Sequence, residues 1–435
     1  MWVRERQTQA TFVLVVAFFV GLVTGTAAAL LKWTIGGLAE LLTSRFSHRG
    51  PDLWYILLAV FGIVATGAFT RYILKYRVQH GVEDLLRRIR EKKPDMPPRL
   101  MFGSMIASTL TLGFGGSAGA EGPIAYTGAA IGSNLARKLG MSPQMVMTLM
   151  CCGAGAGIAG IFKSPIGGAL FTIEVLRIEL STLSLLALIL ASLISGVTAY
   201  VLGGFQFDIH WDSFIPFDPA VMPWIILLAV FCGFYSYYYA AVMKWLRGRF
   251  DSIKNPWVVN LVSGLILGLL LVLFPALYGE GYDVISKLLS GENLAMFDGS
   301  IWVDDLGSVH ALMWLTAGAL MMKCWAACAT NSGGGVAGDF APTLFAGALA
   351  GLLFATFVNT FFGTALPTPI FALAGMSAVM SGAIRAPFMA IFLTMEMTAS
   401  YGYILPIIVA GAISFGVVKA LTPGSFYPLR RLDSN

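Results

Sequence analysis

Charged side chains are scarce in this sequence of 435 residues. They make up 12% of the chain, about half of the roughly 25% that is usual in a soluble domain. Hydrophobic residues make up 57%, and the mean hydropathy is +0.77. Such a chain cannot cover its surface with polar groups in water, which excludes a soluble enzyme, a nucleic-acid-binding protein and a disordered protein. We therefore expect a polytopic protein of the lipid bilayer with no nucleic-acid partner.

Histidine and cysteine are also few. The four histidines are scattered, and the five cysteines lie in apolar stretches. An odd set of such cysteines argues against a disulfide framework, so we expect small buried hydrophobic side chains there. No metal-binding motif and no nucleophile–base set is recognisable, so we expect no metal, no cofactor and no catalytic residue. The cysteines are Cys151, Cys152, Cys232, Cys324 and Cys328.

Long apolar runs recur along the chain, each near the roughly 20 residues that a spanning helix needs. Shorter segments interrupted by glycine lie between them, and several are too short to span. Such segments are typical of broken or re-entrant helices that line a cavity inside the protein. The sequence thus predicts an all-α integral membrane fold. The long runs are 11–31, 53–70, 183–202, 222–243, 257–278, 309–328, 343–362 and 402–420; the short segments are 101–118, 122–139, 145–161, 165–178, 370–383 and 387–398.

The charges in the loops predict the orientation. Residues 71–99 contain nine Lys or Arg and residues 244–254 contain four, and further arginines lie near both termini. The loop at 203–221 has aspartates and no Lys or Arg, and the loop at 279–306 has six acids against one lysine. Because basic loops tend to stay in the cytoplasm, the two acidic loops are expected outside. We predict a multi-pass protein of the cell membrane with both termini in the cytoplasm.

The strongest feature of the sequence is an internal repeat. Residues 116–132 match 335–351 at a shift of 219, and residues 153–174 match 375–396 at a shift of 222. Chance composition would not keep glycines, prolines, a glutamate and a basic residue in one register. We interpret the chain as two homologous halves.

The boundaries of these halves follow from the apolar runs. The N-terminal transmembrane half covers 1–202, an external linker covers 203–219, and the C-terminal half covers 220–435, with no cytoplasmic regulatory domain. The first half would start inside and the second outside. This inverted repeat is typical of transporters whose site lies near the midplane.

The glycine-rich segments 116–123 and 335–342 occupy matched positions, and each leads into a helix start with a proline. Unpaired backbone N–H groups and the positive end of the helix dipole favour an anion at such a place. Two helix starts that converge would bind a desolvated anion without a full positive charge, and so allow fast passage. The alternative is that these glycines only permit close packing.

Acidic residues accompany these segments. Glu121 lies in the first glycine-rich turn, and a carboxylate in a membrane core is a functional candidate by default. It could occupy the anion site as a tethered anion that protonation releases, or it could only cap its helix. Asp339 is the analogous acid in the second half, and a cap and a pore role stay equally open. Glu174 and Glu396 are expected to be structural, as caps or ion pairs that hold each half together.

At these residues the sequence resembles the CLC family of chloride channels and proton-coupled chloride exchangers. Residues 119–123, GAEGP, are similar to the family's G-R-E-G-P segment, and Glu121 matches its gating glutamate. Residues 338–342, GDFAP, resemble the G-x-F-x-P segment whose amides contact the central anion, and Tyr427 matches the pore tyrosine. The family's G-S-G-I-P segment falls on 79–83, QHGVE. The resemblance implies an anion site made by His80, Gly81, Gly119, Gly122, Gly338, Asp339, Phe340, Ala341 and Tyr427.

The resemblance spans nearly the whole chain. It implies a homodimer with one anion pathway in each subunit, chloride as the substrate, and protons as a second substrate in an exchanger. We expect no counterpart of the family's cytoplasmic CBS domains, since eight residues follow Tyr427.

Three residues depart from the family pattern. His80 replaces the serine of G-S-G-I-P, a position that tracks anion preference in the family, so the anion stays open. Ala120 replaces the arginine beside the gate, which is expected to weaken the local positive field. Val175 stands where the family's exchangers usually carry an internal proton-accepting glutamate, and an apolar side chain cannot relay a proton.

Two functions therefore stay open. Val175 favours a passive chloride channel gated by Glu121. The gating glutamate and the compact chain favour a proton-coupled exchanger, in which a water chain or another acid replaces the missing glutamate. An intramembrane enzyme with Glu121 and Asp339 as paired acids is a remote alternative.

Overall fold

The computed structural model describes residues 2–44, 52–76, 81–178, 181–209, 211, 215–294, 297, 299–302 and 308–422. Within these residues the chain forms sixteen α-helices and no β-strand, as predicted. The helices are α1 (Trp2–Thr43), α2 (Trp54–Ala68), α3 (Gly81–Arg90), α4 (Leu100–Gly113), α5 (Glu121–Lys138), α6 (Pro143–Phe162), α7 (Pro165–Leu170), α8 (Thr182–Leu202), α9 (Met222–Asp251), α10 (Pro256–Leu273), α11 (Tyr282–Leu289), α12 (Val309–Ser332), α13 (Phe340–Phe362), α14 (Thr368–Ile384), α15 (Pro387–Met397) and α16 (Ile404–Leu421).

Nine helical segments of the described chain are long and apolar enough to cross a membrane. One of them, α6, was expected to be a short broken segment but is an uninterrupted helix of 20 residues. Its glycines lower helix propensity, yet they allow α5 to approach closely: a Cβ added at Gly153 would lie 2.0 Å from the carbonyl oxygen of Gly128. The second half repeats this contact, because a Cβ at Gly375 would lie 2.2 Å from the carbonyl oxygen of Gly347. Small residues at such crossings are typical of helix packing in lipid.

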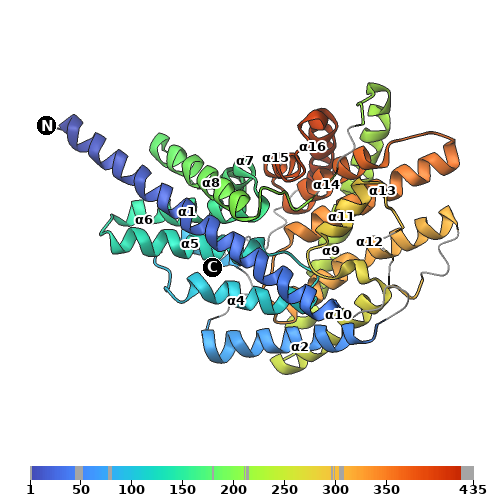
Figure 1. The fold of residues 1–435 in the computed structure, drawn as a ribbon, viewed down its shortest axis with the longest axis horizontal. Coiled ribbons are helices and arrows are strands. Elements are labelled where there is room, and N and C mark those ends of the chain that lie inside the picture. The colour runs from blue at the N-terminus through green and yellow to red at the C-terminus, as the bar shows by residue number, and fades with distance from the viewer. Residues whose placement is uncertain are drawn as a thin grey trace.

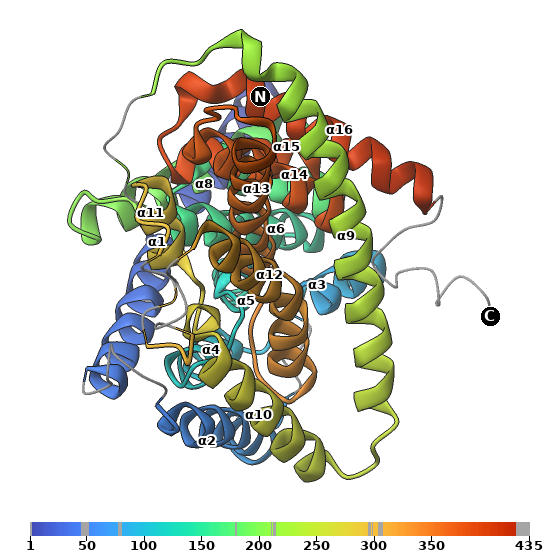
Figure 2. The ribbon, with the colours of Figure 1, turned by 90° about the vertical axis from the view of Figure 1, so that its right-hand side faces the viewer.

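The two parts of the chain lie next to each other. In Figure 1 most helices of residues 1–202, blue to green, lie on the left, and most helices from residue 220 onward, yellow to red, lie on the right. Within the first part α5 packs on α6, and within the second part α13 packs on α14. The two parts also meet along α2 and α10, which run side by side in Figures 1 and 2.

Two glutamates join the parts by capping helices reciprocally. The carboxylate of Glu174 accepts the backbone N–H groups of Phe388 and Met389, at 3.3 and 2.7 Å, at the start of α15. The carboxylate of Glu396 accepts the N–H groups of Ile166 and Gly167, at 3.2 and 2.9 Å, at the start of α7. Both therefore cap helices, as expected. The expectation that they hold each half together was wrong, because each caps a helix of the other half.

Ion pairs show which loops share a face. Lys32 Nζ lies 2.8 Å from Glu280 Oε2 and 3.7 Å from Asp208 Oδ2, so the two acidic loops meet. Arg247 Nη1 lies 3.1 Å from Glu83 Oε1, so the two basic segments meet elsewhere. This grouping agrees with the charge pattern of the sequence, while the side of the membrane on which each group lies stays a prediction.

Candidate anion-binding site

The two glycine-rich loops touch through their backbones. The N–H of Gly119 donates to the carbonyl of Gly338 at 3.0 Å, and the N–H of Gly338 donates to the carbonyl of Gly119 at 2.7 Å. Four residues earlier in each loop, Gly115 and Gly334 have φ angles of +99° and +109°, which residues with a side chain rarely adopt. The loops therefore turn in the same way and bring the starts of α5 and α13 together.

Two buried threonines hold the loops crosswise. Thr111, at the end of α4, accepts the N–H of Val336 on its Oγ1 at 3.0 Å. Thr330, at the end of α12, accepts the N–H of Ser117 on its Oγ1 at 3.0 Å. Each threonine thus satisfies a buried backbone group of the loop from the other half. The two hydrogen bonds tie each loop to the end of a helix.

Glu121 is the first residue of α5 and reaches across to α13. Its side chain is 1% exposed, and its Oε1 accepts the backbone N–H of Phe340, the first residue of α13. Its Oε2 has no hydrogen-bond partner among the described residues. The glycines make room for it, since a Cβ at Gly119 would lie 1.8 Å from Oε2 and a Cβ at Gly338 would lie 2.4 Å from Oε1. The carboxylate therefore occupies the place that the two helix starts create for an anion.

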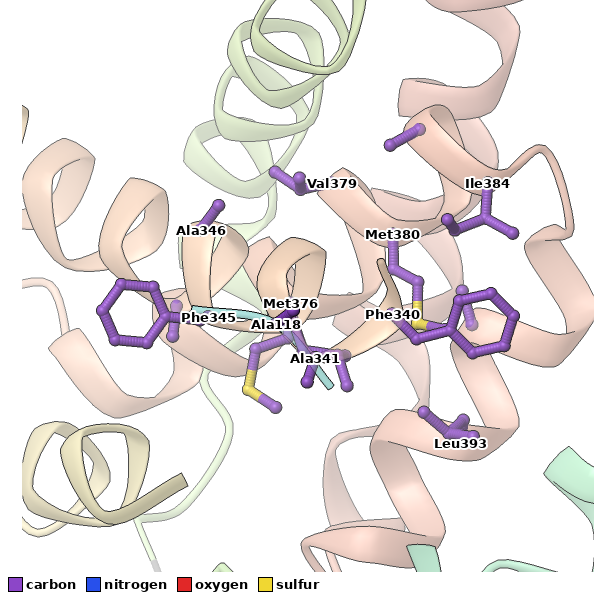
Figure 3. Close-up of a cluster of buried hydrophobic side chains, with 14 of the residues drawn as sticks. Ala118, Phe340, Ala341, Phe345, Ala346, Met376, Val379, Met380, Ile384 and Leu393 are labelled. Carbon is purple, nitrogen blue, oxygen red and sulfur yellow. The ribbon is translucent and has the colours of Figure 1, made fainter. Parts of the chain in front are cut away.

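Apolar side chains surround the start of α13. The ring of Phe340 is 2% exposed and packs edge-on against Phe171 at 5.8 Å between centroids. Figure 3 shows Met380 of α14 and Leu393 of α15 beside Phe340, and Ala118 beside Ala341. These groups exclude water, so the backbone N–H groups act on an anion in a medium of low polarity, where electrostatic interactions are strong.

The model of the voltage gated chloride channel family matches residues 61–419. The chain belongs to the CLC family. It is 29% identical over 410 residues to a ClcB-like chloride channel protein of Ralstonia nicotianae, covering 91% of this chain and 90% of that one. It is 27% identical to the H(+)/Cl(-) exchange transporter ClcA of Vibrio parahaemolyticus, covering 91% and 84%. As CLC proteins transport chloride and are not enzymes, the chain is a multi-pass membrane protein of chloride transport.

Solved CLC structures share this fold. A slow cyanobacterial Cl-/H+ antiporter superposes with a TM-score of 0.79 at 23% identity, covering 97% of this chain and 98% of that chain. A CLC-type fluoride/proton antiporter superposes with a TM-score of 0.77 at 23% identity, with the same coverage. The predicted CLC-type helical fold is therefore confirmed.

The structure brings most of the expected CLC residues together. Gly119, Gly338 and Phe340 all contact the Glu121 carboxylate or each other, as described above. Gly122 and Ala341 lie in the first turns of α5 and α13, beside these groups, and both are buried. Gly81 begins α3. His80 and Tyr427 lie outside the described residues, so their expected places at the anion stay predictions.

Asp339 precedes α13 at its N-cap position, yet its side chain does not cap the helix. Its Oδ1 accepts a hydrogen bond from Asn331 Nδ2 at 2.7 Å, at the end of α12. This contact fastens α12 to the loop before α13. Glu121, rather than Asp339, is the carboxylate placed on the N–H of Phe340.

Helix α3, which Gly81 begins, is fastened to α5 by Asp84. The Asp84 carboxylate accepts hydrogen bonds from Arg88 Nε at 2.9 Å, from the Tyr76 hydroxyl at 3.0 Å and from the buried Tyr126 hydroxyl of α5. Burial by itself would raise the pKa of Asp84, but these hydrogen bonds and the Arg88 charge outweigh it and hold the pKa below its usual range. The start of α3 therefore has a fixed position relative to α5.

Three charged residues near the site were missed in the sequence. Lys323 of α12 is fully buried, and its Nζ donates to Ser117 Oγ at 2.9 Å, beneath the first glycine-rich loop. Lys32 and Glu280 meet at the other side of this loop, where Glu280 Oε1 accepts the N–H of Ala120 at 3.0 Å. The weaker positive field expected from Ala120 stays a prediction: two lysines from other helices lie nearby, but Lys32 is paired with Glu280 and Asp208. The sequence does contain a signal for Lys323, because it is the one lysine in the apolar run 309–328, and a charged residue inside such a run is a functional candidate.

No group of three His, Cys, Asp or Glu side chains in the described chain is arranged to hold a metal ion.

Proposed function

We propose that the protein conducts chloride across the cell membrane through a pathway gated by Glu121 in each subunit of a homodimer. The observation that carries the proposal is the hydrogen bond from the N–H of Phe340 to the Glu121 carboxylate. In this arrangement the carboxylate is a tethered anion that competes with chloride for the same helix start. Protonation removes its charge and lets chloride take its place, so acidity increases flux.

The absence of proton coupling is the finer part of the proposal. Val175 is 8% exposed and lies in the turn that follows α7, at the position of the exchangers' internal glutamate. Its side chain carries no proton. Protons then reach Glu121 only from the side of the membrane on which the gate opens. They regulate gating and are not transported.

Proton-coupled chloride exchange is the second candidate. The similarity to the transporter ClcA, named as an exchanger, favours it. Glu121 would carry the proton through the outer part of the path, and a water chain would replace the glutamate that Val175 displaces.

Chloride is the proposed anion, because the ClcB-like relative is named as a chloride channel protein. His80 leaves room for another halide, and one CLC relative of known structure is a fluoride/proton antiporter. The grouping of acidic and basic loops supports termini in the cytoplasm.

The test uses the purified chain in chloride-loaded liposomes, with chloride efflux and external pH recorded together. A channel moves chloride only when valinomycin shunts the charge, and protons stay still. An exchanger driven by a chloride gradient moves protons uphill in a fixed ratio, which would establish the second candidate. In the Glu121→Gln variant we expect flux to be kept or increased and its pH response to be lost. A complete loss of flux in that variant would contradict gating by Glu121.

A further inference from the structure

We propose that Glu280 is a second tethered carboxylate, which guards the approach to the Glu121 site, and that Lys32 holds the incoming anion when Glu280 moves away. The inference rests on the proposed anion pathway. It concerns a site beside the first glycine-rich loop, on the face where the two acidic loops meet.

The backbone around Glu280 directs its side chain inward. Gly279 and Gly281 flank it with φ angles of +64° and +84°, a region that favours glycine. A Cβ at Gly281 would also lie 2.5 Å from the Phe345 ring. This double-glycine turn leads directly into α11 and leaves the Glu280 side chain only 10% exposed.

The Glu280 carboxylate bridges a helix start and a cation. Its Oε1 accepts the N–H of Ala120, the N-cap of α5, at 3.0 Å, and its Oε2 lies 2.8 Å from Lys32 Nζ. Ala120 directly precedes Glu121, whose own carboxylate lies on the start of α13. Each of the two helix starts is therefore occupied by a carboxylate of the chain itself, which is the role a free anion would otherwise fill.

The charges around Lys32 explain why departure of Glu280 would create an anion site. Lys32 also lies 3.7 Å from Asp208 Oδ2, and Lys163 Nζ lies 3.0 Å from Asp208 Oδ1. The two lysines and the two carboxylates form a neutral cluster. When Glu280 moves away, the cluster keeps one net positive charge and a free N–H of Ala120, in a place that is largely shielded from water.

A second observation at this place points to a ligand. The Lys32 ammonium lies 4.1 Å from the centre of the Tyr282 ring. The Tyr282 side chain is 7% exposed, and its hydroxyl has no hydrogen-bond partner in the described chain. Buried hydroxyl groups are normally satisfied. The ring that Lys32 contacts therefore carries a buried hydroxyl donor without an acceptor, a group that a small anion could satisfy.

The alternative is that Glu280 is only a helix cap joined to a surface ion pair. Glu174 is the matched control, because it also caps a helix start from a distant segment through two N–H groups, but no lysine among the described ion pairs binds it. A Glu→Gln change at either position removes the charge and keeps an acceptor. A purely structural role predicts that both changes lower stability without changing anion binding.

The experiment is calorimetric titration of chloride into the detergent-purified full chain and its variants. We expect Glu280→Gln to bind chloride about three- to tenfold more tightly, or with one more ion per subunit, and Glu174→Gln to bind as the unchanged protein does. Glu121→Gln is measured in parallel to test the central site. Tighter binding in Glu121→Gln but not in Glu280→Gln would overturn the outer site and leave the proposed function intact. Tighter binding in Glu280→Gln alone would support the outer site and overturn the gate.

If Glu280→Gln does not fold, Glu280→Ala decides. The alanine side chain removes both the charge beside Lys32 and the acceptor of the Ala120 N–H, so chloride binding should still tighten. Unchanged binding in this variant overturns the proposal. Lys32→Gln should shift chloride binding in the opposite direction, by weakening it several-fold, and tighter binding there would also overturn it.

Discussion

Gly119 and Gly338 are 219 positions apart in the sequence, yet they exchange two backbone hydrogen bonds, at 3.0 and 2.7 Å. The pair lies where the starts of α5 and α13 converge, and both glycines are within reach of the Glu121 carboxylate. Their contact fixes the distance between the two helix starts. The position of the Glu121 carboxylate therefore depends on these two residues having no side chain.

The first prediction is that Gly338→Ala displaces Glu121. The new Cβ would lie 2.4 Å from Glu121 Oε1 and 2.9 Å from the backbone nitrogen of Gly122, and the backbone cannot yield as the carboxylate can. We expect a loss of about 1–3 kcal/mol in the free energy of unfolding, typical of overpacking, and a weaker pH response of chloride flux. Gly416→Ala lies inside α16, where nothing is within 4 Å of the new Cβ. It should not lower the free energy of unfolding, since alanine favours a helix more than glycine does, and it should not change the pH response. A stable Gly338→Ala protein with the original pH response would show that the contact is not tight.

The second prediction concerns the buried lysine. None of the ion pairs in the described chain includes Lys323, which is 0% exposed and lies over the Phe345 ring at 4.6 Å. An anion at the glycine-rich loop would act as its counterion. We expect Lys323→Met to weaken chloride binding several-fold, and Lys323→Arg to weaken it less. The same change of charge at the exposed Lys419 is the control, and equal effects at both positions would refute a local role.

The third prediction compares the reciprocal caps. Glu396 is 6% exposed and accepts three hydrogen bonds, one from Ser164 Oγ at 2.5 Å and two from backbone N–H groups. Glu174 is partly exposed and accepts hydrogen bonds from two backbone N–H groups. Glu396→Gln should therefore lower the free energy of unfolding by about 1–3 kcal/mol, and Glu174→Gln by about 0.5–2 kcal/mol. Thermal unfolding in detergent measures both. The reverse order would mean that burial does not set the strength of these caps.

The fourth prediction is a pH dependence. The pKa of Asp84 is held below its usual range in the folded protein. A depressed pKa contributes stability that is fully present above the unfolded value of about 3.9 and is lost as the pH falls through the folded value. Asp84→Asn should thus melt below the unchanged protein at pH 7, and the gap should narrow only below about pH 4. A gap that narrows already between pH 7 and 5 would mean that the hydrogen bonds to Asp84 do not depress its pKa.

Much of the fold could be predicted from the sequence because lipid leaves few solutions. Spanning segments must satisfy their backbone groups internally, so apolar runs of the right length become helices such as α8, α12 and α13. The short helices α3 and α11 were not predicted, since neither is an apolar run. The length of α6 was underestimated, because its glycines predict breaks, whereas they are contact points with other helices, and Gly153 and Gly157 contact α5. The two halves, the dimer and the orientation stay predictions.

The sequence by itself determined that this is a helical membrane protein with matched glycine-rich loops, and that Glu121 is the acid to test. Local chemistry is sufficient for that, because glycine, proline and an acid have the same conformational and electrostatic effects at any helix start. Only the tertiary structure decided which groups those residues meet. Glu121 accepts a hydrogen bond from the N–H of Phe340, and Glu280 accepts one from the N–H of Ala120. Glu174, in residues 1–202, caps a helix in residues 220–422, and Glu396 does the reverse. These contacts join residues 160 to 230 positions apart, and no local pattern encodes them, since they depend on how residues 1–202 and 220–422 pack against each other.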